Sequence, residues 1–230
     1  MVSTAIPRSA SAAGNGDVAR AGHGTQVPRV VDSPSVRMNW AETLYIGSRL
    51  RTRRLRRNVV PELIELGGGT KGLAVLDVGC GPGECVACEL DMFGAKSVTA
   101  IDLDPKMVAR AQGRLAGYGG RASVGTGDVT DLQFPVGHFD AVFNFAVLHH
   151  VPDWQSGLGE IARVLAPGGR FFSQDHDVAN HDWLSRQLFR HPPDRFTNAE
   201  FLDQLAVAEL EVLGVNDQPG QLLVAACKRG

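Results

Sequence analysis

The sequence lacks the features that mark membrane-spanning, secreted and nucleic-acid-binding proteins. It has no run of about 18 apolar residues, the length that a membrane-spanning helix requires, and its N-terminus lacks the charged-then-apolar order of a secretory signal. The 23 Lys and Arg residues nearly balance the 25 Asp and Glu residues, so the net charge is −2 and bulk charge argues against a nucleic-acid partner. We therefore expect a cytoplasmic protein with no nucleic acid bound and no stable membrane insertion.

Cysteine is also scarce, and the four in the chain are Cys80, Cys85, Cys88 and Cys227. They are too few, and the first three are too clustered, for a disulfide framework. The spacing C-x4-C-x2-C followed by a distant fourth cysteine is also that of plant-type iron–sulfur sites. However, Cys85 and Cys88 lie three positions apart on an expected helix with apolar neighbours, which favours small buried core residues. We expect no metal site.

Two N-terminal segments differ from the rest of the chain. Residues 1–36 are rich in Ala, Ser, Gly and Pro without helical or strand periodicity, which predicts a disordered tail. Residues 37–66 are expected to form two helical pieces around Gly47, and they carry six arginines between positions 49 and 57. These arginines indicate either a contact with an anionic ligand or surface, or a solvated helix face.

From Gly72 onward, short apolar strands alternate with helices. The expected strands are 73–78, 97–103, 122–129, 140–147 and 169–175, and the expected helices are 83–93, 105–116 and 154–165. This alternation predicts an α/β fold with a mostly parallel, doubly wound sheet that has helices on both faces. A capping box at Thr197 predicts a further helix to about residue 208, and a hairpin of strands 210–215 and 221–227 follows it.

These segments predict one domain after the tail. With 43% hydrophobic and 21% charged residues the chain is globular, and its length suits a single domain at 37–230. The expected parts of that domain are N-terminal helices at 37–66, a core at 67–177, an insert at 178–196, and a closing helix and hairpin at 197–230.

The strongest chemical signal is the segment VLDVGCGPGE, residues 75–84, where a buried strand ends in alternating glycines and a helix begins. The backbone turns sharply there, and a ligand can approach glycine more closely than a Cβ would permit. Asp102 ends the next strand, 19 positions after Gly83, and a carboxylate at that place can accept both hydroxyls of a ribose. Asp128 ends the third strand, where it can accept from an adenine amine while Val129 holds the ring.

The class of ligand follows from Glu84. A dinucleotide fingerprint G-x-G-x-x-G beginning at Gly79 requires a small residue at that position, where a negative charge would also face the pyrophosphate. A ligand with a ribose and an amino-acid end but no phosphate fits better, because Asp77 and Glu84 can then serve an ammonium group or order the loop. Helix capping by Asp102 and an ordinary turn at Asp128 are the alternative roles of these aspartates.

Five motifs in order give the sequence a family resemblance: VLDVGCGPGE, AIDLDPKMV, GDVTDLQFPVGHFDAV, LHHVPD and RVLAPGGRF. With them, residues 40–229 resemble the class I S-adenosylmethionine-dependent methyltransferases, and specifically the methyltransferase type 11 group related to ubiquinone and menaquinone biosynthesis. The resemblance implies a Rossmann-like sheet of seven strands whose last hairpin strand is antiparallel, and it implies that residues 37–66 form an N-terminal helical lid.

The resemblance also implies the cofactor site. The cofactor would be S-adenosylmethionine, with S-adenosylhomocysteine as the product. Its methionine end is expected to contact Asp77, Gly79, Gly81 and Gly83. Its ribose is expected at Asp102 and Leu103, its adenine at Asp128 and Val129, and two further contacts at Phe145 near the end of strand four and Tyr45 of the lid.

The reaction implied is transfer of a methyl group to a small-molecule acceptor by in-line displacement. A general base is needed only when the acceptor is protonated at the working pH. Because ligands lie at the carboxyl edge of an open sheet, the candidates are the polar residues after strands four and five, namely His149, Asp175 and His176. A positioning role is the alternative for His149. The stretch 176–182 also contains metal-ligating residue types, although an exposed polar loop accounts for them.

The acceptor is expected between the lid and the insert at 178–196. The insert is rich in aromatic residues and arginine, which suits an aromatic or lipid-like acceptor that carries negative charge; closing the sheet edge is the alternative role of these aromatics. A monomer or homodimer acting on a small molecule is the expected form. The rival functions are a protein that binds S-adenosylmethionine without methyl transfer or for another reaction, and a nicotinamide-dependent reductase.

Overall fold

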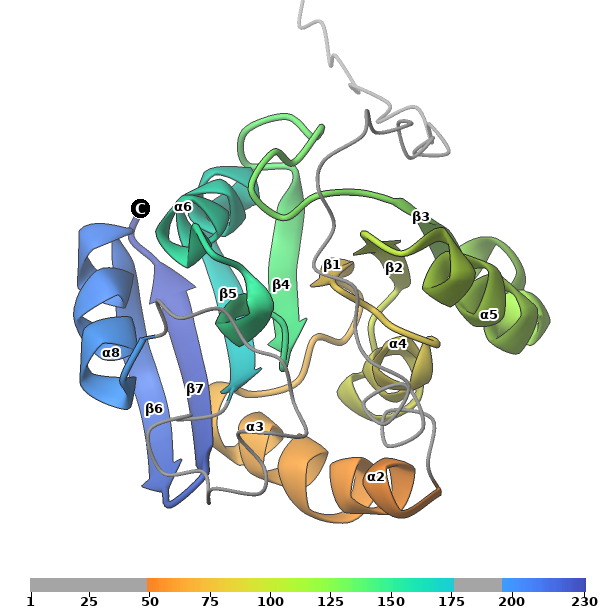
Figure 1. Cartoon of the computed structure of the whole chain (residues 1–230), viewed down its shortest axis with the longest axis horizontal. Helices are drawn as coiled ribbons and strands as arrows, with labels where there is room; N and C mark the ends of the chain where they lie inside the picture. Colours follow the sequence, from red (N-terminus) through yellow and green to blue (C-terminus); the bar gives the residue numbers. More distant parts are fainter. Residues whose placement is uncertain (1–48, 176–195) are drawn as a thin grey trace, which may run out of the picture.

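The computed structural model describes residues 49–175 and 196–230 (Figure 1). The tail at 1–36, the first part of the expected lid and most of the expected insert lie outside these residues. Two of the expected site residues, Tyr45 and His176, therefore also lie outside the described part of the chain. Within that part, no helix is long and apolar enough to cross a membrane.

A single sheet of seven strands forms the centre of the domain, in the order β3-β2-β1-β4-β5-β7-β6. The strands are β1 (Ala74–Val78), β2 (Ser97–Asp102), β3 (Ala122–Thr126), β4 (Phe139–Phe145), β5 (Leu165–Asp175), β6 (Leu210–Gln218) and β7 (Gln221–Lys228). The first five pair in parallel, and β7 is antiparallel to both β5 and β6. The doubly wound α/β sheet with an antiparallel last hairpin strand is thus confirmed.

Helices connect the strands, and three of them begin at a residue whose side chain caps the helix. The helices are α2 (Arg49–Arg54), η1 (Leu55–Val59), α3 (Val60–Gly67), α4 (Glu84–Cys88), η2 (Glu89–Phe93), α5 (Pro105–Leu115), η3 (Ala116–Arg121), η4 (Leu148–His150), α6 (Trp154–Val164) and α8 (Asn198–Val207). Asp104 caps α5 by accepting from the Lys106 N–H at 2.8 Å, with Pro105 in the first turn. Thr197 and Glu200 form the expected capping box of α8.

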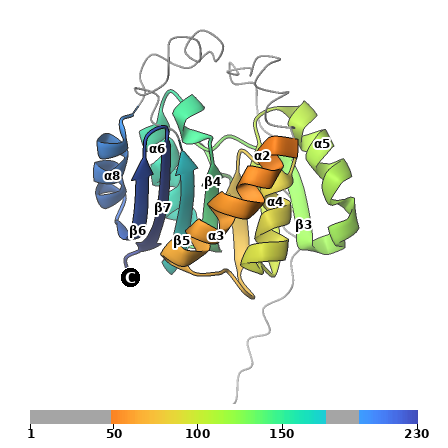
Figure 2. The same ribbon diagram turned by 90° about the horizontal axis from the view of Figure 1, so that it is seen from below.

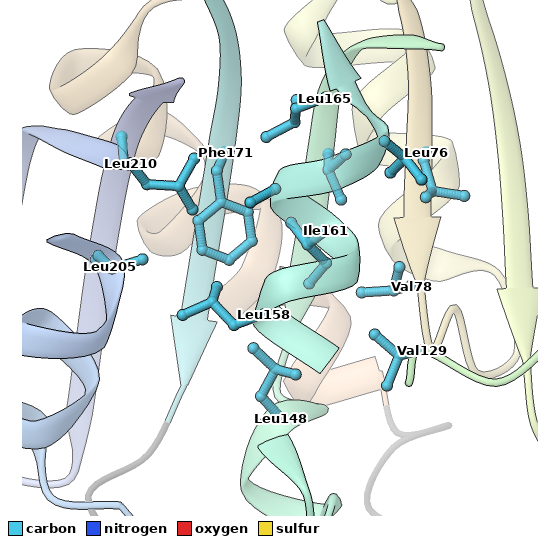
Figure 3. Packing of buried hydrophobic residues seen from close by; sticks show 14 of the residues in the cluster. Leu76, Val78, Val129, Leu148, Leu158, Ile161, Leu165, Phe171, Leu205 and Leu210 are labelled. Carbon is cyan, nitrogen blue, oxygen red and sulfur yellow. The ribbon is translucent and has the colours of Figure 1, made fainter. Parts of the chain in front are cut away.

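The helices cover both faces of the sheet and divide its core into two clusters (Figure 2). On one face, Leu158 and Ile161 of α6 pack with Phe171 of β5 and Leu205 of α8 (Figure 3). On the other face, residues of η1, α3, α4 and α5 pack against β1, β2 and β4. Burial of apolar side chains on both faces is what stabilises a mostly parallel sheet of this kind.

Several expected boundaries differ from the structure, among them the following three. The helix expected at 83–93 divides into α4 and the π-helical turn η2, which ends at Gly94 in a left-handed conformation with φ of 80°. The third strand ends at Thr126 rather than residue 129, because the backbone then turns around Asp128. Strand β5 begins at Leu165 rather than residue 169, and its pairing with β4 shifts register between Leu165 and Arg170.

Candidate functional site

The glycine loop joins β1 to α4 at the carboxyl edge of the sheet and requires glycine for two separate reasons. Gly79, Gly81 and Gly83 all have positive φ values, of 68°, 53° and 83°. A Cβ on Gly79 would lie 2.3 Å from Val147 Cγ2, and one on Gly83 would lie 3.2 Å from the Ala111 Cα of α5. The loop is therefore held in a conformation and a packing that other residues would disturb.

Asp102 at the end of β2 ties this loop to the neighbouring strand. Its Oδ2 accepts from the Gly81 N–H and its Oδ1 accepts from the Asp104 N–H, each at 2.8 Å. Burial raises the pKa of this carboxyl, while the two backbone hydrogen bonds lower it. Leu103, which follows it, is partly exposed at the edge. The ribose contact expected of Asp102 stays a prediction, and the structure adds that its carboxylate fixes the loop.

Asp77 places a buried carboxylate just below the loop. It lies on the face of β1 that packs against α4, it is fully buried, and neither oxygen has a hydrogen-bond partner among the residues that the structure describes. Glu89 on the same side is equally buried, and within the described part of the chain its oxygens also have no hydrogen-bond partner. Burial, above all, raises the pKa of both carboxyls, and the negative charge of Asp77 adds to the effect on Glu89. An arriving ammonium group would compensate such a site.

The turn after β3 forms the part of the site where adenine is expected. Asp128 Oδ1 accepts from the Thr130 N–H at 2.9 Å and from the Thr130 hydroxyl at 2.7 Å. This is the turn role that the sequence left open, and it leaves Oδ2 without a donor among the described residues. Val129 is buried in the core on the α6 face. Both residues stay predicted adenine contacts.

The end of β4 adopts an unusual backbone conformation. Phe145 is buried and stacks on Phe143 at a centroid distance of 5.7 Å, so it packs in the core on the α4 side. Ala146 then has a φ of 62°, rare for a residue with a Cβ, and its N–H donates to the Gln174 carbonyl at 2.6 Å. Such conformations cluster at functional sites. This turn directs the chain toward the histidine pair in η4.

His149 and Asp175 meet where β4 and β5 end. His149 Nδ1 is hydrogen bonded to Asp175 Oδ1, and both side chains are buried. The other carboxylate oxygen, Oδ2, accepts from Asn144 Nδ2 at 3.0 Å. The His150 ring lies 3.9 Å from that of His149. Two of the expected catalytic residues, 26 positions apart in sequence, thus form one buried dyad.

Asn144 is a site residue that the sequence analysis missed. Its Nδ2 also donates to Ser173 Oγ at 2.8 Å, and its Oδ1 accepts from the Val147 and Leu148 N–H groups at 3.2 and 3.3 Å. It therefore fixes both the η4 turn and the carboxylate of Asp175. The sequence signal that could have identified it is a single amide side chain between two phenylalanines, near the end of an otherwise apolar strand. A buried polar side chain needs hydrogen-bond partners, so such a residue indicates a polar contact inside the protein.

The residues present fit S-adenosylmethionine better than a metal. The unpartnered Asp77 carboxylate suits an ammonium group, and the glycine loop permits close approach of the ligand to the backbone. Within residues 49–175 and 196–230, no group of three or more His, Cys, Asp or Glu side chains is arranged to hold a metal ion. The possible metal ligands at 176–182 lie outside the described residues.

The chain matches known proteins at these same elements. Residues 75–169 match the family described as "Methyltransferase domain". The chain is 35% identical over 124 residues to the sterol 24-C-methyltransferase of Eremothecium gossypii, covering 53% of this chain and 31% of the relative. It is 38% identical over 101 residues to the 27-O-demethylrifamycin SV methyltransferase of Amycolatopsis mediterranei, covering 43% of this chain and 37% of the relative. The chain thus spans about a third of the length of these curated relatives.

A solved structure shares this fold over most of the chain. The S-adenosylmethionine-dependent methyltransferase of Aquifex aeolicus superposes with a TM-score of 0.66 at 22% identity, covering 81% of this chain and 97% of that one. S-adenosylmethionine is the cofactor that this fold and the family match imply. The seven-stranded sheet is thus the fold of that methyltransferase, and the part of the chain that holds the glycine loop matches the methyltransferase domain family.

Proposed function

We propose that this protein transfers the methyl group of S-adenosylmethionine to a hydroxyl group of a small aromatic or lipid-like molecule, with His149 as the general base. The observation that carries the proposal is the buried hydrogen bond between His149 and Asp175 at the carboxyl edge of the sheet. The glycine loop and Asp102 lie at the same edge, where parallel strands place their ligands.

The dyad suits proton abstraction because hydrogen bonds fix the position of both of its side chains. With Asp175 ionised, the shared hydrogen lies on Nδ1 of His149, so the lone pair of the imidazole is on Nε2. Asn144 donates a hydrogen bond to Asp175 and accepts one from the backbone N–H next to His149. These two bonds fix the positions of the His149 and Asp175 side chains relative to each other. When bound, the cofactor supplies a methyl group activated on a sulfonium. His149 Nε2 takes the proton of the acceptor hydroxyl as its oxygen acquires that methyl group.

The dyad favours a hydroxyl acceptor over a carbon acceptor. A general base accelerates methyl transfer chiefly when the nucleophile carries a proton at the working pH, as an alcohol or phenol does. The names of the two relatives refer to a carbon of a sterol and to an oxygen of a rifamycin, so relationship alone does not choose the atom. One relative is named for a sterol and the other for a rifamycin, which supports a small-molecule acceptor.

The proposed compartment is the cytoplasm. All four cysteines are free thiols, and Cys80, Cys85 and Cys88 are buried. Free, clustered thiols are usual where glutathione keeps cysteines reduced.

The direct test measures label transfer and cofactor binding separately. The protein is incubated with methyl-labelled S-adenosylmethionine and a panel of phenols, sterols and hydroxy fatty acids, and the products are identified by mass spectrometry. We expect His149→Ala to lower kcat by about 10²- to 10⁴-fold, because it removes the base, while calorimetry shows unchanged affinity for S-adenosylhomocysteine. Asp175→Asn is expected to lower kcat in the same direction.

A matched histidine outside the site provides the control. His138 is exposed and stacks on Phe134, so His138→Ala should leave both kcat and cofactor affinity unchanged. Equal activity of His149→Ala and wild type would disprove the role of the base. Binding of S-adenosylhomocysteine without label transfer to any acceptor would favour a protein that binds the cofactor without methyl transfer. Stabilisation by NADH alone would favour the reductase.

A further inference from the structure

The helical segment that begins with α2 carries a dense group of arginines. Residues 49–58 read RLRTRRLRRN, which contains six arginines and no acidic residue. They form α2 and most of η1, and the helix continues from there into α3. Leu55 and Val59 are buried on the inner side of the segment. Packing against the domain therefore uses one side of the segment and accounts for its apolar residues, but not for its arginines.

Two of the arginines attach α2 across the carboxyl edge of the sheet. Arg51 Nη1 lies 3.9 Å from Oε2 of Glu84, the residue that directly follows the glycine loop. Arg54 donates a hydrogen bond to the side chain of Gln221, which lies next to the residue of β7 that pairs with Asp175. The first turns of α2 therefore lie between the glycine loop and the end of β5, at the edge where the candidate site opens.

A second group of side chains on the same segment points into solvent. Leu50, Arg53 and Arg57 follow one another at spacings of three and four, so they share one side of the helix, and all three are exposed. Leu50 is 78% exposed, more than any other large apolar side chain of the described residues. We call these three residues the basic face.

The arginines of the basic face differ from their neighbours in having no partner. Among residues 49–175 and 196–230, neither Arg53 nor Arg57 makes a hydrogen bond or an ion pair. Arg56, by contrast, lies 3.3 Å from Asp91 Oδ2. Like charges four positions apart destabilise a helix, so Arg53 and Arg57 do not help the segment to fold. An anionic partner outside the domain would offset this repulsion.

The exposed leucine indicates what kind of partner fits. A nucleic acid would account for two arginines, but it offers no apolar region to cover Leu50, and the net charge of the chain is −2. A helix that presents arginine and an exposed leucine together suits an anionic bilayer, where the arginines meet the headgroups and the apolar side chain enters the acyl boundary.

We propose that the basic face docks this protein on the surface of an anionic lipid bilayer, without insertion of a helix. Because α2 lies at the carboxyl edge, docking would turn the opening of the candidate site toward the lipid. The use of that orientation to collect a lipid-like acceptor rests on the proposed function, whereas the docking itself does not.

The experiment measures cosedimentation of the full chain with vesicles, without cofactor or acceptor. One set of vesicles contains equal parts of phosphatidylcholine and phosphatidylglycerol, and the other contains phosphatidylcholine alone. We expect the protein to bind the first set and not the second. Binding should fall sharply at about 1 M salt, where charges are screened beyond about 3 Å.

Substitutions on the basic face should weaken this binding in separate ways. Arg53→Gln and Arg57→Gln should each lower the partition coefficient about fivefold, and together about 25-fold, because each arginine acts on the surface charge independently. Leu50→Ser should lower it about tenfold, the size of burying one leucine. Circular dichroism should show unchanged helix content, since glutamine favours helix about as well as arginine does.

An arginine at the opposite edge of the sheet provides the matched control. Arg229 is exposed and follows the end of β7, which lies far from the start of β7 beside Asp175. Figure 1 shows the C-terminus on the side of the molecule opposite α2. Arg229→Gln changes the net charge as Arg53→Gln does, and it should leave vesicle binding unchanged.

The outcomes separate docking from the proposed function. Failure to bind the anionic vesicles, an equal loss of binding in Arg229→Gln, or no effect of Leu50→Ser would overturn the docking surface. Release by soluble glycerol 3-phosphate at the same phosphate concentration would assign the arginines to single phosphate groups and would also overturn it. Vesicle binding without label transfer to any acceptor would support docking and contradict the proposed methyl transfer.

Discussion

Replacing Asp102 with alanine tests the centre of the cofactor site. Asp102 accepts two backbone hydrogen bonds of 2.8 Å, one of which comes from the Gly81 N–H of the glycine loop. A hydrogen bond to a charged group contributes about 1.5–3 kcal/mol. Without it, the cofactor has to order the loop as it binds, and if that whole energy is taken from binding, the affinity falls about tenfold or more. The predicted ribose contacts would add to this loss. We therefore expect Asp102→Ala to bind S-adenosylhomocysteine at least about tenfold more weakly.

Calorimetry at constant pH measures this effect, with Asp104→Ala as the matched control. Asp104 is two positions away and accepts from the Lys106 N–H at the start of α5, so its loss should cost about 1 kcal/mol of stability without changing affinity. The compound 5′-methylthioadenosine lacks the amino-acid end of the cofactor but retains the ribose, so Asp102→Ala should weaken its binding as well. An Asp102→Ala protein that is folded and binds S-adenosylhomocysteine as wild type does would refute the reasoning.

Two further predictions concern stability. Because burial raises the pKa of Glu89 above its unfolded value of 4.5, the folded protein loses stability as the pH rises from that value through the folded pKa. Glu89→Gln should thus raise Tm by roughly 2–4 °C at pH 8 and leave Tm unchanged near pH 4. The same difference in Tm between variant and wild type at both pH values would contradict this prediction. Gly83 and Gly72 both have φ near 80°, but of the two only Gly83 has packed atoms where a Cβ would lie. Gly83→Ala should therefore lower Tm more than Gly72→Ala. Equal decreases in Tm would contradict the packing argument.

Most of the fold was predictable because it depends on local patterns. Apolar strands alternating with helices specified the parallel core, and the capping box at Thr197 specified the start of α8. The hairpin at the end of the described chain followed from its two apolar strands. The π-helical turn at 89–93 was not predictable, because the segment has an ordinary helical pattern and its wider turn is not marked by any residue type.

The candidate site was predictable where its residues follow the end of a single strand, and unpredictable where residues far apart in the sequence come into contact. Glycine at 79, 81 and 83 identified the loop before the structure did. The contact between His149 and Asp175 depends on the register between β4 and β5, which the sequence does not specify. The hydrogen bond from Asn144 to Asp175 depends on the same register. Likewise, the hydrogen bond from the Gly81 N–H to Asp102 depends on the pairing of β1 with β2.

The position of β7 has a consequence for how the chain is made. It is the last of the seven strands to be synthesised, yet it lies inside the sheet, between β5 and the edge strand β6. Until residues 221–228 emerge from the ribosome, β5 has an open edge and β6 has no strand to pair with. An exposed strand edge invites pairing with other chains, and long-range pairing is slow. A nascent chain that stalls before this strand is therefore a species prone to aggregate.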